Sequence, residues 1–181
     1  PGSWASVYRV HNLMVGAYGA MMAGNSREAL RAAHRLERII TPDLLLSDPS
    51  LPDLVESHRT TLPHVLVRFG RWEEILALDL PEDQELFCST TAMIHYARGV
   101  ALSALRRLPE AQAAREDFRA ATARVPETRL NSVPSREVDA LAVASRMLDG
   151  ELLYRQGEFD EAFAALEEAI ELEDGLPYSD P

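Results

Sequence analysis

The spacing of apolar positions along the chain is the first guide to its fold. Apolar residues recur every three or four positions through most of the sequence, whereas strict alternation of apolar and polar residues is nearly absent. The first spacing places apolar side chains on one face of an α-helix, and alternation is the pattern of a half-buried strand. The sequence therefore predicts an all-α protein whose helices are joined by turns, without strands.

Helix-breaking residues divide this helical pattern into pairs. Four sites interrupt it: Gly24-Asn25, Gly70-Arg71, Arg106 to Pro109 and Gly157-Glu158. Glycine commonly ends a helix, and proline favours the first turn of the next one. We therefore expect four helical hairpins, at approximately residues 5–40, 53–80, 86–125 and 136–173, in a single domain spanning residues 4–181. The proline-bearing stretches 41–53 and 125–135 are predicted to be connecting loops.

Composition and charge narrow the class of protein and its partners. The chain has 181 residues, of which 46% are hydrophobic and 26% charged, which is typical of one soluble globular domain. With 29 acidic and 18 basic residues it has no cationic excess to neutralise phosphates, so we expect no nucleic-acid partner. No run approaches the roughly 20 apolar residues of a membrane-spanning helix. A single cysteine, Cys88, suits a reducing compartment, and the cytoplasm is the expected location.

The predicted hairpins also share an internal repeat. In each one, a small or apolar residue follows five positions after the turn, and the last copy is the clearest. That segment, residues 150–170, resembles a tetratricopeptide repeat, in which small residues let the two helices of a pair approach closely. The matching positions are Gly150, Leu153, Ala162, Leu166 and Ala169. Segments 11–13, 67–72 and 176–178 are also similar to segments of bacterial multi-repeat proteins.

The other three copies match the repeat less completely. The first keeps its small residues, at Ala17, Ala20, Ala29 and Ala33. In the third, Arg106 stands where the turn glycine is expected, and in the second Ile75 replaces the alanine and Pro81 shortens the second helix. The turns lie 46, 36 and 51 residues apart instead of the regular 34. The resemblance thus implies a right-handed α-α superhelix, a solenoid of about four hairpins that is irregular along its length.

The same resemblance indicates where a partner would bind, because the first helix of each pair lines the concave face of such a solenoid. The residues expected there are His11, Met14, Tyr18, His64, Arg68, Tyr96, Met147, Glu151, Tyr154 and Arg155. Methionine adapts to apolar ligands, so this groove suits an amphipathic helix or an extended peptide. Some first-helix methionines, such as Met21 and Met22, could instead fill the core between pairs. The leading hypothesis is a protein- or peptide-binding scaffold without a cofactor.

An alternative hypothesis is a metal-dependent or small-molecule-processing enzyme. His11, His64 and His95 lie on successive first helices and Glu151 on the fourth, so folding could gather them around a divalent transition metal, or copper if methionine sulfur joins them. The histidines could equally be independent hydrogen-bonding residues. A dyad of Cys88 with His64 or His95 is a weaker alternative, because the surroundings of Cys88 are apolar. No phosphate-binding loop, His-Glu-x-x-His pair or nucleophile elbow occurs, so the interpretation leans away from an enzyme.

The two ends of the chain lead to further expectations. Pro1-Gly2-Ser3 resembles the remnant of a removed tag and is left out of the fold prediction. After residue 173 the sequence offers no polar capping helix, and a solenoid without a cap exposes an apolar end. We therefore expect either a chain shortened at its C terminus or self-association through this end. A third possibility is a structural segment of a longer repeat protein, inert by itself.

Overall fold

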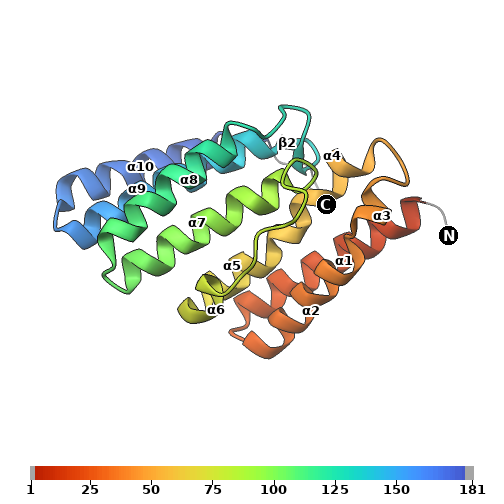
Figure 1. Ribbon diagram of the computed structural model, residues 1–181, viewed down its shortest axis with the longest axis horizontal. Helices are drawn as coiled ribbons and strands as arrows, with labels where there is room; N and C mark the ends of the chain where they lie inside the picture. The colour runs from red at the N-terminus through yellow and green to blue at the C-terminus, as the bar shows by residue number, and fades with distance from the viewer. Residues whose placement is uncertain (1–2, 178–181) are drawn as a thin grey trace.

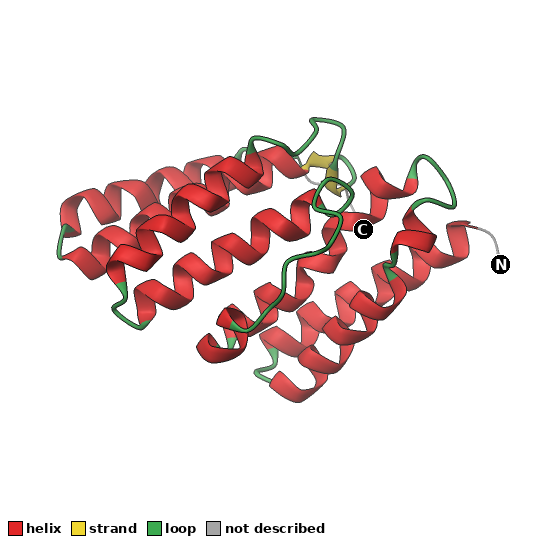
Figure 2. Ribbon diagram, viewed as in Figure 1, coloured by secondary structure: helices red, strands yellow, loops and turns green. Residues whose placement is uncertain are grey.

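The computed structural model of the protein describes residues 3–177, with side chains from residue 5 onward, and it is mostly helical, as predicted (Figure 2). The helices are α1 (Ser3–Met22), α2 (Ser26–Ile39), α3 (Pro42–Leu45), α4 (Leu51–Val55), the 3-10 helix η1 (Glu56–Thr60), α5 (Thr61–Arg68), α6 (Trp72–Leu76), α7 (Cys88–Ala104), α8 (Leu108–Thr122), α9 (Glu137–Gln156) and α10 (Phe159–Asp174). Two short strands, β1 (Leu130–Ser132) and β2 (Ser135–Arg136), pair antiparallel. Pro1 and Gly2 of the suggested tag remnant lie outside the described residues. None of the described helices is long and apolar enough to cross a membrane.

The helix pairs stack side by side along the molecule. They follow one another from α1/α2 at one end, through α5/α6 and α7/α8, to α9/α10 at the other end (Figure 1). Within each pair the two helices contact each other, and the second helix also contacts the first helix of the next pair: α2 with α5, α6 with α7, and α8 with α9. The first helices contact one another in the same order. The core is therefore shared between neighbouring pairs along the stack.

All four helix pairs turn through the same backbone conformation. Gly24, Gly70 and Gly157 have φ values of 69°, 63° and 94°, and Arg106 takes the equivalent place in the third pair with φ 61°. In each turn, the next residue's amide bonds to a carbonyl five positions back, as in Arg107 N to Leu102 O at 2.8 Å. This is the Schellman closure, which satisfies free carbonyls at a helix end. Arg106 is the one residue other than glycine with positive φ in residues 3–177, so the repeat geometry persists where its sequence signature is lost.

Small residues let the helices approach closely in the α7 to α10 half. A Cβ atom on Gly99 would lie 2.8 Å from the Cδ1 atom of Leu148, so α7 meets α9 at this glycine. A Cβ atom on Gly150 would lie 2.6 Å from the Cγ atom of Leu166, where α9 meets α10. Ala162, five residues after the last turn, is fully buried. These contacts are tight because glycine has no side chain, so a leucine of the facing helix packs directly on its backbone.

The second pair departs most from a regular hairpin. Its second helix, α6, ends at Leu76, and residues 77–87 then run back in an extended path toward the start of α7 (Figure 1). Arg98 Nη2 on α7 holds this segment by donating to the Leu78 carbonyl at 2.6 Å. The predicted loop 41–53 contains α3 and the beginning of α4, because Leu45 and Leu51 are buried in the core. The loop 125–135 contains β1 and the first residue of β2, so the prediction of a chain without strands was wrong here.

Candidate functional site

The most exposed apolar surface of a first helix lies on α1. Tyr8, Val15, Tyr18 and Met22 are 68%, 49%, 58% and 57% exposed, and His11 among them is exposed as well. Their spacing of three or four residues puts all five on one face of α1, which we call the α1 row. Sequence reasoning identified His11 and Tyr18 but missed Tyr8 and Val15. Tyr8 and Val15 lie three and four residues from His11, and this spacing could have indicated that they share its face. The same spacing more often marks the buried face of a helix.

The predicted groove residues of α5 are also open to solvent. His64 and Arg68 are exposed one helical turn apart. They lie on the opposite side of α5 from Leu62 and Pro63, which line a hollow beneath the 77–87 segment. On the neighbouring helix α1, Met14 is half-buried and packs with the core formed by α1, α2, α3 and α4.

His11 has a histidine neighbour that the sequence did not suggest. His58 on η1 lies close enough for the charge of His11 to act on it. Burial of the His58 ring lowers its pKa, and the proximity of His11 lowers it further because two imidazolium charges repel each other. The His58 ring therefore favours its neutral form.

The prediction for the third pair needs correction. Tyr96 is only 7% exposed, and its ring packs edge-on against Phe118 of α8 at a centroid distance of 5.8 Å. Burial, with the Glu151 carboxylate nearby, raises the pKa of Tyr96 to about 12. The reason is the position of α7 in the middle of the stack, where α5 and α6 cover one side and α8 and α9 the other. Tyr96 therefore belongs to the core and not to an open groove.

On α9 the two predicted orienting charges satisfy each other. Arg155 Nε donates to Glu151 Oε1 at 2.8 Å, and the Arg155 guanidinium lies 5.7 Å from the centre of the Tyr154 ring. Met147 and Tyr154 are exposed. Of the charged residues predicted for the groove, this leaves Arg68 without an ion pair in the described structure.

At the end of the stack, α10 adds exposed apolar residues to those of α9. Tyr154 contacts Phe159 and Phe163 at centroid distances of 5.2 and 6.4 Å, and Ile170 is exposed two turns further along α10. Residues 159, 163 and 170 have helical spacing, so they share one face. We call Tyr154, Phe159, Phe163 and Ile170 the end patch. It corresponds to the apolar end that the sequence led us to expect.

The candidate metal ligands are not assembled into a site. Within residues 3–177, no group of three or more histidine, cysteine, aspartate or glutamate side chains could hold a metal ion. His95 instead faces Asp117 of α8, with Nδ1 and Oδ2 3.8 Å apart, and burial lowers the pKa of the His95 ring. Cys88 is buried, and desolvation together with the Glu56 carboxylate raises the pKa of its thiol. A thiol held protonated in this way is a poor nucleophile.

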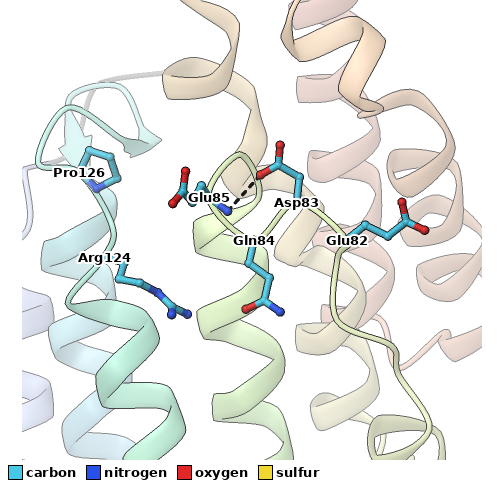
Figure 3. A pocket seen from close by; sticks show the side chains of 6 residues that line it. All are labelled: Glu82, Asp83, Gln84, Glu85, Arg124 and Pro126. Carbon is cyan, nitrogen blue, oxygen red and sulfur yellow. Dashed lines mark hydrogen bonds between the residues drawn. The ribbon is translucent and has the colours of Figure 1, made fainter.

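The largest of the hollows described lies between the 77–87 segment and the end of α8. It encloses about 960 Å³ and is lined by Glu82, Asp83, Gln84, Glu85, Arg124 and Pro126 (Figure 3). The Asp83 carboxylate already accepts the Glu85 and Leu86 amides at 3.2 and 2.9 Å, which fixes the loop before α7. None of the predicted groove residues lines it. The hollow is open and acidic, with its charged groups at the surface.

A buried ionic cluster joins three parts of the chain that are distant in sequence. Glu56 is fully buried, and its carboxylate accepts the Ser89 and Thr90 amides at 3.2 and 2.9 Å, capping α7. Arg129 Nη1 lies 3.3 Å from Glu56 Oε2 and donates to the Pro52 carbonyl at 2.6 Å. Burial raises the pKa of the nearby Glu137 to about 7. No cavity leads to these carboxylates among the hollows described, so the cluster supports the fold.

No family model, no curated protein and no solved structure matches this chain.

Proposed function

We propose that this protein is a helical-repeat scaffold of the tetratricopeptide type that binds a protein or peptide segment on the face formed by its first helices. The observation that carries the proposal is the α1 row, in which four large apolar side chains are each about half or more exposed. Contiguous exposed apolar surface on a folded domain commonly marks an interaction site, whereas single exposed apolar residues need no explanation.

The chemistry of this face favours an amphipathic helix as the partner. Exposed residues spaced by three and four positions match the apolar stripe of a second helix laid alongside. His11 within the α1 row, and His64 and Arg68 on α5, supply hydrogen-bond donors next to the apolar contact. A partner segment with an apolar stripe flanked by carbonyl or carboxylate groups would complement these residues.

Two features support the repeat assignment within this proposal. The four turns share one closure although one lacks glycine, and every helix pair contacts the next through both of its helices. Both are expected of a solenoid in which each unit buries its face against a neighbour. The buried, unpaired thiol of Cys88 fits a reducing compartment such as the cytoplasm.

Binding by peptides selected on the intact chain tests the proposal. Peptides from a random library displayed on phage would be selected on the immobilised protein, synthesised, and their dissociation constants measured by fluorescence anisotropy. Because Tyr18 is central in the α1 row, Tyr18→Glu is expected to weaken binding by about tenfold or more, the range of a hot-spot residue. The control Leu46→Glu, at an exposed leucine after α3, is expected to change nothing.

Circular dichroism would establish that both variants keep the wild-type helix content. Selected peptides that bind Tyr18→Glu as tightly as the wild-type protein would show that the first-helix face is not the binding site.

A further inference from the structure

The two ends of the stack carry opposite charge. Helices α1 and α2 together contain five arginines and two glutamates. Helix α10 contains seven carboxylates and no basic residue. The chain as a whole has a formal charge of −11, so the cationic character of the first pair is local. Surfaces of opposite electrostatic potential attract each other, whereas two ends that carry the same charge repel each other.

The acidic end is also apolar. The end patch on α9 and α10 exposes an isoleucine and three aromatic rings, with the Tyr154 ring in contact with both phenylalanine rings. Glu167 and Asp174 are exposed four residues after Phe163 and Ile170, so they lie one helical turn further along, beside the patch. An apolar centre with a charged rim is the usual composition of a protein interface.

The basic end offers a complementary recess. A hollow of about 180 Å³ lies between α1 and α2, with Gly16 and Ala32 among its lining residues and Arg31 and Arg35 at its side. A Cβ atom built on Gly16 would meet nothing within 4 Å, and the same is true of Gly19 one turn further on. Another chain can thus come close to the α1 backbone there. Arg31 bonds to Glu28 at the surface, and Arg35 has no ion pair in residues 3–177.

We propose that copies of this chain associate head to tail, with the end patch of one copy seated on the α1/α2 end of the next. The Phe163 side chain of the patch would occupy the recess beside Gly16, and Glu167 would face Arg35. This contact continues the packing within the chain, where α8 receives α9 and α2 receives α5. A symmetric pairing of two end patches is disfavoured because it opposes two helices that each carry seven carboxylates. The proposal does not depend on peptide binding by the α1 row.

A head-to-tail contact leaves one free end on each copy, so assembly continues as concentration rises. The measured mass of the chain should therefore exceed 20.1 kDa increasingly with concentration, as followed by light scattering coupled to size exclusion. About 1 M NaCl should reduce the association, because it shortens the range of the interaction between the charged ends. A chain that stays at the monomer mass at every concentration would overturn the proposal.

Blocking one end at a time distinguishes this contact from any symmetric one. Phe163→Asp disables the acidic end and Arg35→Glu the basic end, so each variant alone should remain a monomer. Mixed in equal amounts, the two should form a dimer of twice the monomer mass, because each supplies the end that the other lacks. A mixture without this dimer would exclude the head-to-tail geometry.

Two exposed residues that belong neither to the end patch nor to the lining of the recess provide matched controls. Leu46→Asp removes an exposed apolar side chain, and Arg124→Glu reverses an exposed arginine just after α8. Both are expected to assemble as the wild-type protein does. Loss of assembly in either one would mean that charge or hydropathy in general, and not these ends, governs the association.

Discussion

The two helices of the last pair and those of the second pair are held together in different ways. In α9/α10 two long helices touch directly, with Gly150 against Leu166 and Ala162. In the second pair, α6 is only five residues long. The segment 77–87 follows it where a longer second helix would continue. Next to this pair, charged side chains bond to backbone groups that have no partner within a helix: Glu56 to two amides at the start of α7, and Arg129 to the Pro52 carbonyl.

This difference shows where buried charged side chains bond to the backbone of this protein. A helix bonds its own backbone groups internally, but short helices and extended segments leave amides and carbonyls without partners. Arg59 likewise bonds the Glu37 and Ile40 carbonyls at the end of α2, at 3.2 and 2.8 Å. Where the repeat is interrupted, buried charged side chains therefore bond to backbone groups. In the regular α8/α9 part of the stack, the carboxylate of the buried Asp149 instead pairs with the side chains of Arg115, Arg119 and Arg146.

The largest expected effect is the loss of the buried arginine. Arg129→Met would leave the fully buried Glu56 carboxylate without its cation and the Pro52 carbonyl without a donor. Breaking one partner of a buried ion pair destabilises a protein by about 3–5 kcal/mol. The free energy of unfolding in urea, measured on wild type and variant, checks this value.

A surface ion pair serves as the control for that measurement. Arg107→Met removes the partner of Glu110, and both residues are exposed. Water solvates the remaining charge, so little change is expected. If Arg107→Met and Arg129→Met destabilise the chain equally, the buried cluster has no special role in the second pair.

The next prediction concerns the pH dependence of the cluster. Burial raises the pKa of Glu137 from 4.5 to about 7, with Glu56 raising and Arg129 lowering it as neighbouring charges. The folded state therefore holds this proton more tightly, so the contribution of Glu137 to stability is complete below 4.5 and is lost as pH rises through about 7. Glu137→Gln stays neutral and can still accept from Asn131.

The variant should thus be more stable than wild type at about pH 8 and close to it at about pH 4.5. The difference in unfolding free energy between the two proteins isolates Glu137 from other titrating groups, such as His58, whose pKa burial lowers. A constant difference across this pH range would contradict the assignment.

The smallest expected effects compare a packed glycine with an open one. Gly150→Ala would bring a Cβ atom to 2.6 Å from Leu166 Cγ and 3.1 Å from the Ala162 carbonyl, so we expect α10 to shift and stability to fall by about 1–3 kcal/mol. Gly16→Ala meets no atom within 4 Å on an equally helical backbone and should stabilise the monomer by about 0.5–1 kcal/mol. Thermal unfolding at low protein concentration would record both, and equal signs would refute the packing argument.

The candidate site was only partly predictable. His11 and Tyr18 were expected at an open face and are exposed, but Tyr96 was expected there and is buried. The buried cluster was not predicted, because Glu56 and Arg129 are 73 residues apart and no local pattern relates them. Its members resemble ordinary surface charges in the sequence. Whether the first-helix face binds a partner remains the proposal that the peptide experiment tests.

The sequence by itself determined the helical character of the chain and the positions of its turns, because apolar spacing and helix-ending residues act over a few positions along the backbone. It could not determine exposure. Tyr18 and Tyr96 both lie on long first helices, yet one is 58% and the other 7% exposed. Only the tertiary structure decided this, since α1 stands at the end of the stack and α7 has neighbours on both sides.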